Sequence, residues 1–133
     1  MSVITVTDST FEAEVLQSAI PTVVEFTTRI KTNKSGADNA SAKMDKTIDS
    51  LAASYAGTVK FVRVEIELDQ DLKDTLNPST SAKYEINHGP TLVLIKGGAR
   101  AKDSSGTQVD DLVGNYTDEQ VRTWVSRIGG GKL

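Results

Sequence analysis

The stretch Thr22-Val23-Val24-Glu25-Phe26-Thr27-Thr28 is an apolar run with a single carboxylate, Glu25, near its centre. Such a run is typical of a strand that other elements cover on both faces. In an α/β sheet, chemistry is found where such a strand ends and the next helix begins. Here that junction is the polar stretch 29–44, which has no cysteine and no glycine-rich phosphate-binding fingerprint. The sequence therefore indicates a fold more strongly than an activity.

Hydrophobic periodicity on either side of this stretch predicts alternating strands and helices. We expect strands over residues 3–6, 22–28, 59–66, 90–95 and 109–113, and helices from Phe11 for about ten residues, over 41–56, over 69–76 with a further turn at 79–84, and over 117–128. The charged stretch 99–106 should be an exposed hairpin extension. Early crossovers require parallel pairing, whereas the late hairpin requires antiparallel pairing. The sequence predicts an α/β fold with a central mixed β-sheet of about five strands, in the order β-α-β-α-β-α-β-β-α, flanked by helices.

The length and charge of the chain fit one ordinary globular domain. A chain of 133 residues can bury one core, so we expect a single domain over 1–128 and a flexible glycine-rich tail at 129–133. A net charge of -3 and a pI of about 5.1 give no general attraction to nucleic acid or to an anionic membrane. No apolar run approaches the roughly 20 residues of a membrane-spanning helix. We therefore expect a cytoplasmic protein that binds neither nucleic acid nor membrane.

The chain contains no cysteine and one histidine, His88. The absence of cysteine excludes disulfides, thiolate nucleophiles and thiolate metal sites. A single histidine makes a histidine-rich metal site equally unexpected. We predict no cofactor, no metal and no catalytic residue.

Several short segments, in this order along the chain, resemble the thioredoxin family nearly from end to end: Val6-Thr7-Asp8 with Phe11, Val23-Val24-Glu25-Phe26, Leu51-Ala52 with Tyr55 and Gly57, Asn77-Pro78, Gly89-Pro90-Thr91-Leu92, Lys96-Gly97-Gly98 and Val113-Gly114. Each segment is a weak signal, but their order is specific. The resemblance implies a thioredoxin-like fold over the whole predicted domain.

The signature Trp-Cys-Gly-Pro-Cys of that family is absent. Its nearest counterpart is Lys34-Ser35-Gly36-Ala37-Asp38, which would put Ser35 at the attacking cysteine and Asp38 at the resolving one. A hydroxyl and a carboxylate cannot form the disulfide that thiol–disulfide exchange requires. The resemblance therefore implies a redox-inactive, cysteine-less member.

The resemblance also assigns Glu25 to the family's buried acid and Arg63 to its lysine on the adjoining strand. Burial should raise the pKa of Glu25 unless Arg63 reaches it and favours the charged form. Because the chain contains no thiol, Glu25 cannot transfer a proton to one as the family's buried acid does. We interpret Glu25 and Arg63 as a structural buried pair.

Pro90 corresponds to the cis-proline beside the family's active site. In the family, the backbone before this proline pairs with an extended segment of a partner, which would involve His88, Gly89 and Pro90. The alternative is that Pro90 only forms a tight turn that positions the following strand. Gly89 permits close approach of another backbone, which favours the binding surface.

The segment 29–46 carries a net charge of +3, whereas the rest of the chain carries -6; its charged residues are Arg29, Lys31, Lys34, Lys43, Lys46, Asp38 and Asp45. An anion or acidic partner could bind there, especially near the start of the following helix, or the segment is a solvated polar loop. Ser35, Asp38 and His88 are the residue types of a catalytic triad, but nothing in their spacing along the chain supports one.

We therefore expect a protein- or peptide-binding module of adaptor or chaperone type. Its groove would be formed by residues 29–40, including Arg29, Lys31, Ser35 and Asp38, together with His88-Gly89-Pro90 and Tyr116. The alternative is a non-redox enzyme or anion-binding domain built on the 29–46 loop. A third possibility is a remnant of the fold with no retained site.

Overall fold

The computed structural model describes residues 3–128, so the predicted tail at 129–133 lies outside the described residues. At the centre of the fold is a mixed sheet of six strands: β1 (Ile4–Thr5), β2 (Thr22–Thr28), β3 (Lys60–Ile66), β4 (Thr91–Lys96), β5 (Ala99–Arg100) and β6 (Leu112–Val113). The strand order is β1-β3-β2-β4-β5, and β6 also pairs with β4. The first three strands of this order are parallel, and β4 runs antiparallel to β2, β5 and β6. The predicted mixed α/β sheet is confirmed.

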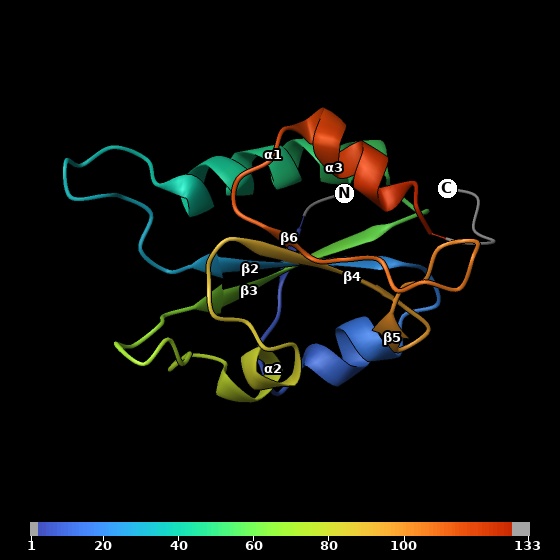
Figure 1. Ribbon diagram of the computed structural model, residues 1–133, viewed down its shortest axis with the longest axis horizontal. Coiled ribbons are helices and arrows are strands. Elements are labelled where there is room, and N and C mark those ends of the chain that lie inside the picture. The colour runs from blue at the N-terminus through green and yellow to red at the C-terminus, as the bar shows by residue number, and fades with distance from the viewer. Residues whose placement is uncertain (1–2, 129–133) are drawn as a thin grey trace.

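Helices cover both faces of the sheet (Figure 1). On one face lie α1 (Ala40–Ser54) and α3 (Asp118–Val125), and on the other lie α2 (Pro78–Lys83) and a π-helical segment, η1 (Glu12–Leu16). Side-chain caps fix where the two longer helices begin. Asn39 Oδ1 accepts a hydrogen bond from the Ala42 amide at 2.9 Å, and Thr117 forms a capping box at the start of α3.

β2 divides the core because its side chains alternate between the two faces. Val23 packs in a cluster beneath α1 and α3, whereas Val24 and Phe26 pack in a second cluster on the side of η1 and α2. Glu25 shares the face of Val23 and is fully buried. The alternation therefore places a carboxylate inside an otherwise apolar layer.

Three hairpins extend the fold: the first covers residues 32–38, the second 68–74 and the third 102–108. The first and last residue of each form an isolated β-bridge. In each, the side-chain oxygen of the second residue accepts hydrogen bonds from the backbone amides two and four residues later; these second residues are Asn33, Asp69 and Asp103. Figure 1 shows the first two hairpins at one end of the sheet and the third at the other.

The second hairpin contradicts the helix predicted over 69–76. Asp69 Oδ1 accepts from the amides of Asp71 and Lys73 at 2.8 and 3.0 Å, so its side chain supplies the local hydrogen bonds that a helix would otherwise make. The helical turn expected at 79–84 is present as α2. The stretch 99–106 contains β5 and most of the third hairpin, whose residues are mainly exposed.

Candidate functional site at the carboxyl ends of β2 and β3

A buried ionic network lies between the sheet and α1. Glu25 and Arg63 are register partners on β2 and β3, and Arg63 Nε donates to Glu25 Oε1 at 2.7 Å. Arg63 Nη2 also donates to the Asp45 carbonyl oxygen at 3.2 Å and to Asp49 Oδ1 at 3.0 Å. The guanidinium therefore links the central strand to two turns of α1.

Lys31 extends this network from the loop after β2. Its Nζ lies 2.8 Å from Asp45 Oδ2 and donates to Thr27 Oγ1 at 2.8 Å. Thr27 Oγ1 in turn donates to Asp45 Oδ1 at 2.8 Å. Lys31 therefore holds the loop against α1, which is a structural contact within the chain.

Burial raises the pKa of Glu25 to about 9, and the Asp45 carboxylate beside it acts in the same direction, so that both outweigh the attraction of Arg63. For Asp45, partial burial acts to raise the pKa, but the neighbouring Glu25 side chain and the contacts with Lys31 and Thr27 outweigh it and lower the pKa. Within residues 3–128, Glu25 Oε2 meets no hydrogen-bond partner. An ionised carboxylate would leave this buried oxygen without a donor, which agrees with the direction of the pKa shift.

The first hairpin carries Ser35 and Asp38 away from this network. Ser35 is exposed, and its Oγ donates to Asn33 Oδ1 at 2.7 Å. Asp38 forms the closing bridge with Thr32, and its Oδ2 lies 2.9 Å from Lys46 Nζ. Neither side chain joins Glu25 and Arg63, because Ser35 lies in the exposed hairpin and Asp38 pairs with Lys46 on the exposed side of α1.

Ser41, the first residue of the helix predicted over 41–56, is a polar side chain at the junction that the sequence analysis did not assign to the site. It lies in the first turn of α1, is 1% exposed, and its Oγ accepts from the Thr28 amide at 3.0 Å. It therefore links the end of β2 to the start of the helix. The signal in the sequence was Asn39, a favoured N-cap residue two positions earlier.

Three of the five cations in the segment 29–46 are paired with acidic side chains. Arg29 Nε pairs with Glu67 Oε1 at 2.5 Å, in addition to the pairs that Lys31 forms with Asp45 and Lys46 forms with Asp38. The Asn39 side chain occupies the amide of Ala42 at the start of α1. Among the described residues, Lys34 and Lys43 are the cations of this segment that form no ion pair.

The Gly89–Pro90 peptide bond is cis. His88 is exposed, Pro90 is buried, and the His88 carbonyl accepts from Thr91 Oγ1 at 2.7 Å. A Cβ at Gly89 would lie 2.7 Å from Thr28 Cγ2, so this chain already fills the space that we had interpreted as room for a partner. Among the hydrogen bonds of residues 3–128, none joins Ser35, Asp38 and His88.

Two aliphatic side chains are exposed near this end of the sheet. Ile30, after β2, is 54% exposed and lines an open depression together with Arg29, Ile66 and Leu68. Val113 on β6 is also 54% exposed and is the register partner of Thr91, next to Pro90. The arrangement offers apolar contact area and contains no set of converging catalytic groups.

The sequence model of the thioredoxin family matches residues 2–119. The chain belongs to the thioredoxin family. It is 29% identical over 116 residues to thioredoxin 1 of Synechococcus elongatus, covering 87% of this chain and 94% of the relative. It is 32% identical over 95 residues to thioredoxin 1 of Nostoc sp., covering 71% and 75%, and 24% identical over 120 residues to thioredoxin C-2 of Corynebacterium nephridii, covering 90% and 97%.

This thioredoxin-family chain lacks the sulfur atoms that thiol–disulfide exchange requires, since its sequence has no cysteine. Residues 3–128 contain no group of three or more histidine, aspartate or glutamate side chains arranged to hold a metal ion. No helix in the described part of the chain is both long and apolar enough to cross a membrane.

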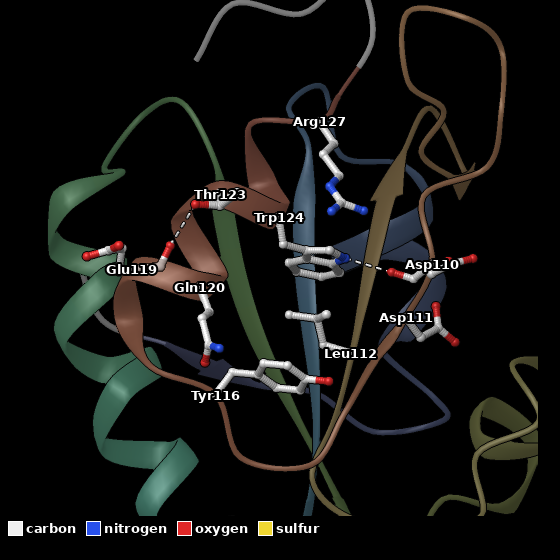
Figure 2. Close-up of a pocket in the computed structure, with 9 residues that line it drawn as sticks. All are labelled: Asp110, Asp111, Leu112, Tyr116, Glu119, Gln120, Thr123, Trp124 and Arg127. Atoms are coloured by element: carbon white, nitrogen blue, oxygen red, sulfur yellow. Dashed lines mark hydrogen bonds between the residues drawn. The ribbon is translucent and has the colours of Figure 1, made fainter.

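Tyr116, which we had expected to join the groove near Pro90, lies in a separate pocket between α3 and residues 110–112 (Figure 2). The Leu112 side chain lies between the rings of Tyr116 and Trp124, and Trp124 Nε1 donates to the Asp110 carbonyl at 2.6 Å. Asp111 at the edge is paired with Arg100 at 2.9 Å. The pocket joins a loop to a helix, so no short motif indicated it.

Proposed function

We propose that this chain is a redox-inactive thioredoxin-family module that binds a protein or peptide, as an adaptor or chaperone does, through the end of the sheet around Ile30, Pro90 and Val113. The exposure of Ile30 and Val113 carries the proposal. Each is a β-branched aliphatic side chain that exposes 54% of its surface beside a junction where the chain buries most other apolar groups.

The internal contacts divide the predicted binding residues into two groups. Lys31, Asp38 and Gly89 are engaged in the structure itself, by an ion pair, by a bridge and by packing against Thr28. Arg29 is paired with Glu67, but it and His88 are both exposed at this end of the sheet, so they remain in the proposed surface. No specific contact favours the alternative of an anion-binding or enzymatic loop.

The test uses a library of random dodecapeptides displayed on phage and selected against the wild-type chain. The affinity of each selected peptide is then measured by fluorescence anisotropy. The double variant Ile30→Asp, Val113→Asp should weaken binding by about tenfold or more, because it puts charge into the apolar contact. Thr107→Asp, in the exposed third hairpin at the other end of the sheet, is the control and should bind as the wild type does.

Circular dichroism establishes that each variant is folded before its affinity is compared. The proposal fails when selection yields no peptide, or when every selected peptide binds the double variant and the wild type equally.

A further inference from the structure

The three hairpins share the same geometry but differ in the type of residue at their fifth position. The fifth residue of each adopts a left-handed backbone conformation, with φ of 83° at Gly36, 60° at Leu72 and 84° at Gly106. Glycine adopts this conformation without steric cost, whereas a residue with a Cβ is strained there. Two hairpins therefore use the residue that the turn favours, and the second hairpin uses leucine.

The leucine side chain gains no compensating burial within the described chain. Leu72 is 55% exposed, the highest fraction among the large exposed hydrophobic side chains of residues 3–128. Position 72 therefore combines a strained backbone with an apolar side chain in water. Each feature alone lowers the stability of the free chain, and strained residues concentrate at functional sites.

Leu72 lines a groove between the second hairpin and α2. Its apolar lining also includes Pro78, Ala82 and Ile86, and its volume is about 570 Å³. Glu85, with φ of 57°, lines the same groove. Leu72 and Glu85 are the two non-glycine residues with positive φ within residues 3–128, and both face this one groove.

The groove is held in shape by Asp74, which closes the second hairpin. Its buried carboxylate accepts hydrogen bonds from the Asn77 amide at 3.0 Å and from Ser81 Oγ of α2 at 2.8 Å. It also accepts from the amides of Glu67 and Leu76. The hairpin and α2 therefore form one connected wall, which reduces the ordering cost of binding.

The rim of the groove is acidic. Asp71 and Glu85 line it as exposed carboxylates above the buried Asp74, against Lys73 as the one lining cation in the described part of the chain. Asp71 and Glu85 form no ion pair within residues 3–128. Arg100 interacts electrostatically with Glu85 but is bound to Asp111. Exposed carboxylates around an apolar centre favour an occupant with cationic flanks.

We propose that this groove is a second docking site, distinct from the surface around Ile30 and Val113, for a peptide segment with one or two large aliphatic side chains flanked by lysine or arginine. The aliphatic side chain packs against Leu72 and the apolar lining, and the flanking cations lie near Asp71 and Glu85. Leucine at position 72 supplies apolar contact to the bound segment.

The same phage-displayed dodecapeptide library tests this proposal with a different set of variants. Peptides for the groove should contain an aliphatic residue next to lysine or arginine. Leu72→Gly should weaken their binding by about tenfold or more while raising the urea midpoint of unfolding, because it removes both the apolar contact and the backbone strain. Asp71→Asn with Glu85→Gln should weaken the same peptides and reduce the salt dependence of their affinity.

Gly106→Leu is the matched control, since it places leucine at the same turn position in a hairpin without this groove. It should lower the urea midpoint and leave peptide affinity unchanged. Ile30→Asp with Val113→Asp should also leave these peptides unaffected, which separates this site from the proposed function. A peptide that depends on Ile30 and Val113 alone supports only that function.

Three outcomes would overturn the proposal. The first is a selection in which no peptide loses affinity on Leu72→Gly, and the second is a set of groove-dependent peptides without basic residues. The third is concentration-dependent self-association, measured by sedimentation, that Leu72→Gly abolishes. That result would assign the groove to a second copy of the chain.

Discussion

Glu25→Gln tests whether the buried carboxyl is neutral in the folded chain. With a folded pKa of about 9 and an ordinary value of 4.5, the folded state holds one more proton than the unfolded state between these two pH values. The contribution of Glu25 to stability is therefore fully present below about pH 4.5 and is lost as the pH rises through 9. Between these limits the free energy of unfolding falls by about 1.4 kcal/mol per pH unit because of this one group.

The wild type should therefore lose about 2.7 kcal/mol relative to Glu25→Gln between pH 6 and pH 8. The amide of glutamine keeps the size of the side chain and an oxygen for Arg63 Nε, so the variant removes the titration with little change in packing. Arg63 and Lys31 then face Asp45 and Asp49, and these four charges balance. This balance is the physical reason why a neutral side chain at position 25 suits the site.

Urea denaturation at pH 6, 7 and 8, followed by the fluorescence of Trp124, gives the free energies. Trp124 is the single tryptophan and is buried, so it reports global unfolding. Glu119→Gln, which removes an exposed carboxylate, should run parallel to the wild type. A difference between Glu25→Gln and wild type that stays constant from pH 6 to 8 would refute a neutral Glu25.

Two further predictions concern packing and buried hydrogen bonds. Gly89→Ala should destabilise the fold by about 1–3 kcal/mol in urea denaturation, because the new Cβ meets Thr28 Cγ2 at 2.7 Å. Thr28→Ser removes that methyl group and should restore part of the loss, whereas equal losses in both backgrounds would contradict the contact. Asp74→Ala should cost at least about 3 kcal/mol in thermal denaturation, since it leaves several donors without an acceptor. Asp74→Asn keeps one acceptor oxygen and should cost less; no difference between the two variants would argue against this network.

The elements that the sequence predicted correctly are those whose stability is decided locally. The apolar run 22–28 became β2 because a doubly covered strand needs apolar side chains on both faces. The helix predicted over 117–128 begins at Thr117, where Thr117 and Gln120 form a capping box whose partners are three residues apart. The order of such elements indicated a mixed α/β sheet, and the resemblance of short segments to the thioredoxin family implied the thioredoxin-like fold.

The site was less predictable because its contacts join residues that are distant in sequence. Lys31 had been assigned to a binding loop, yet its partner Asp45 lies across the junction on α1. Gly89 had been taken as open to a partner, yet Thr28 from β2 occupies that space. Neither contact leaves a pattern in the neighbouring residues, so composition and periodicity could not reveal it.

The sequence by itself determined the α/β order, the central strand and the absence of thiol chemistry, because each follows from residue type and local spacing. Only the tertiary structure decided the state of Glu25, the separation of Ser35 from Ser41 and the groove beside Leu72. Burial and electrostatics at these places depend on side chains contributed by β2, β3, α1 and α2 together. These side chains come close to one another only after the strands have paired and the helices have packed.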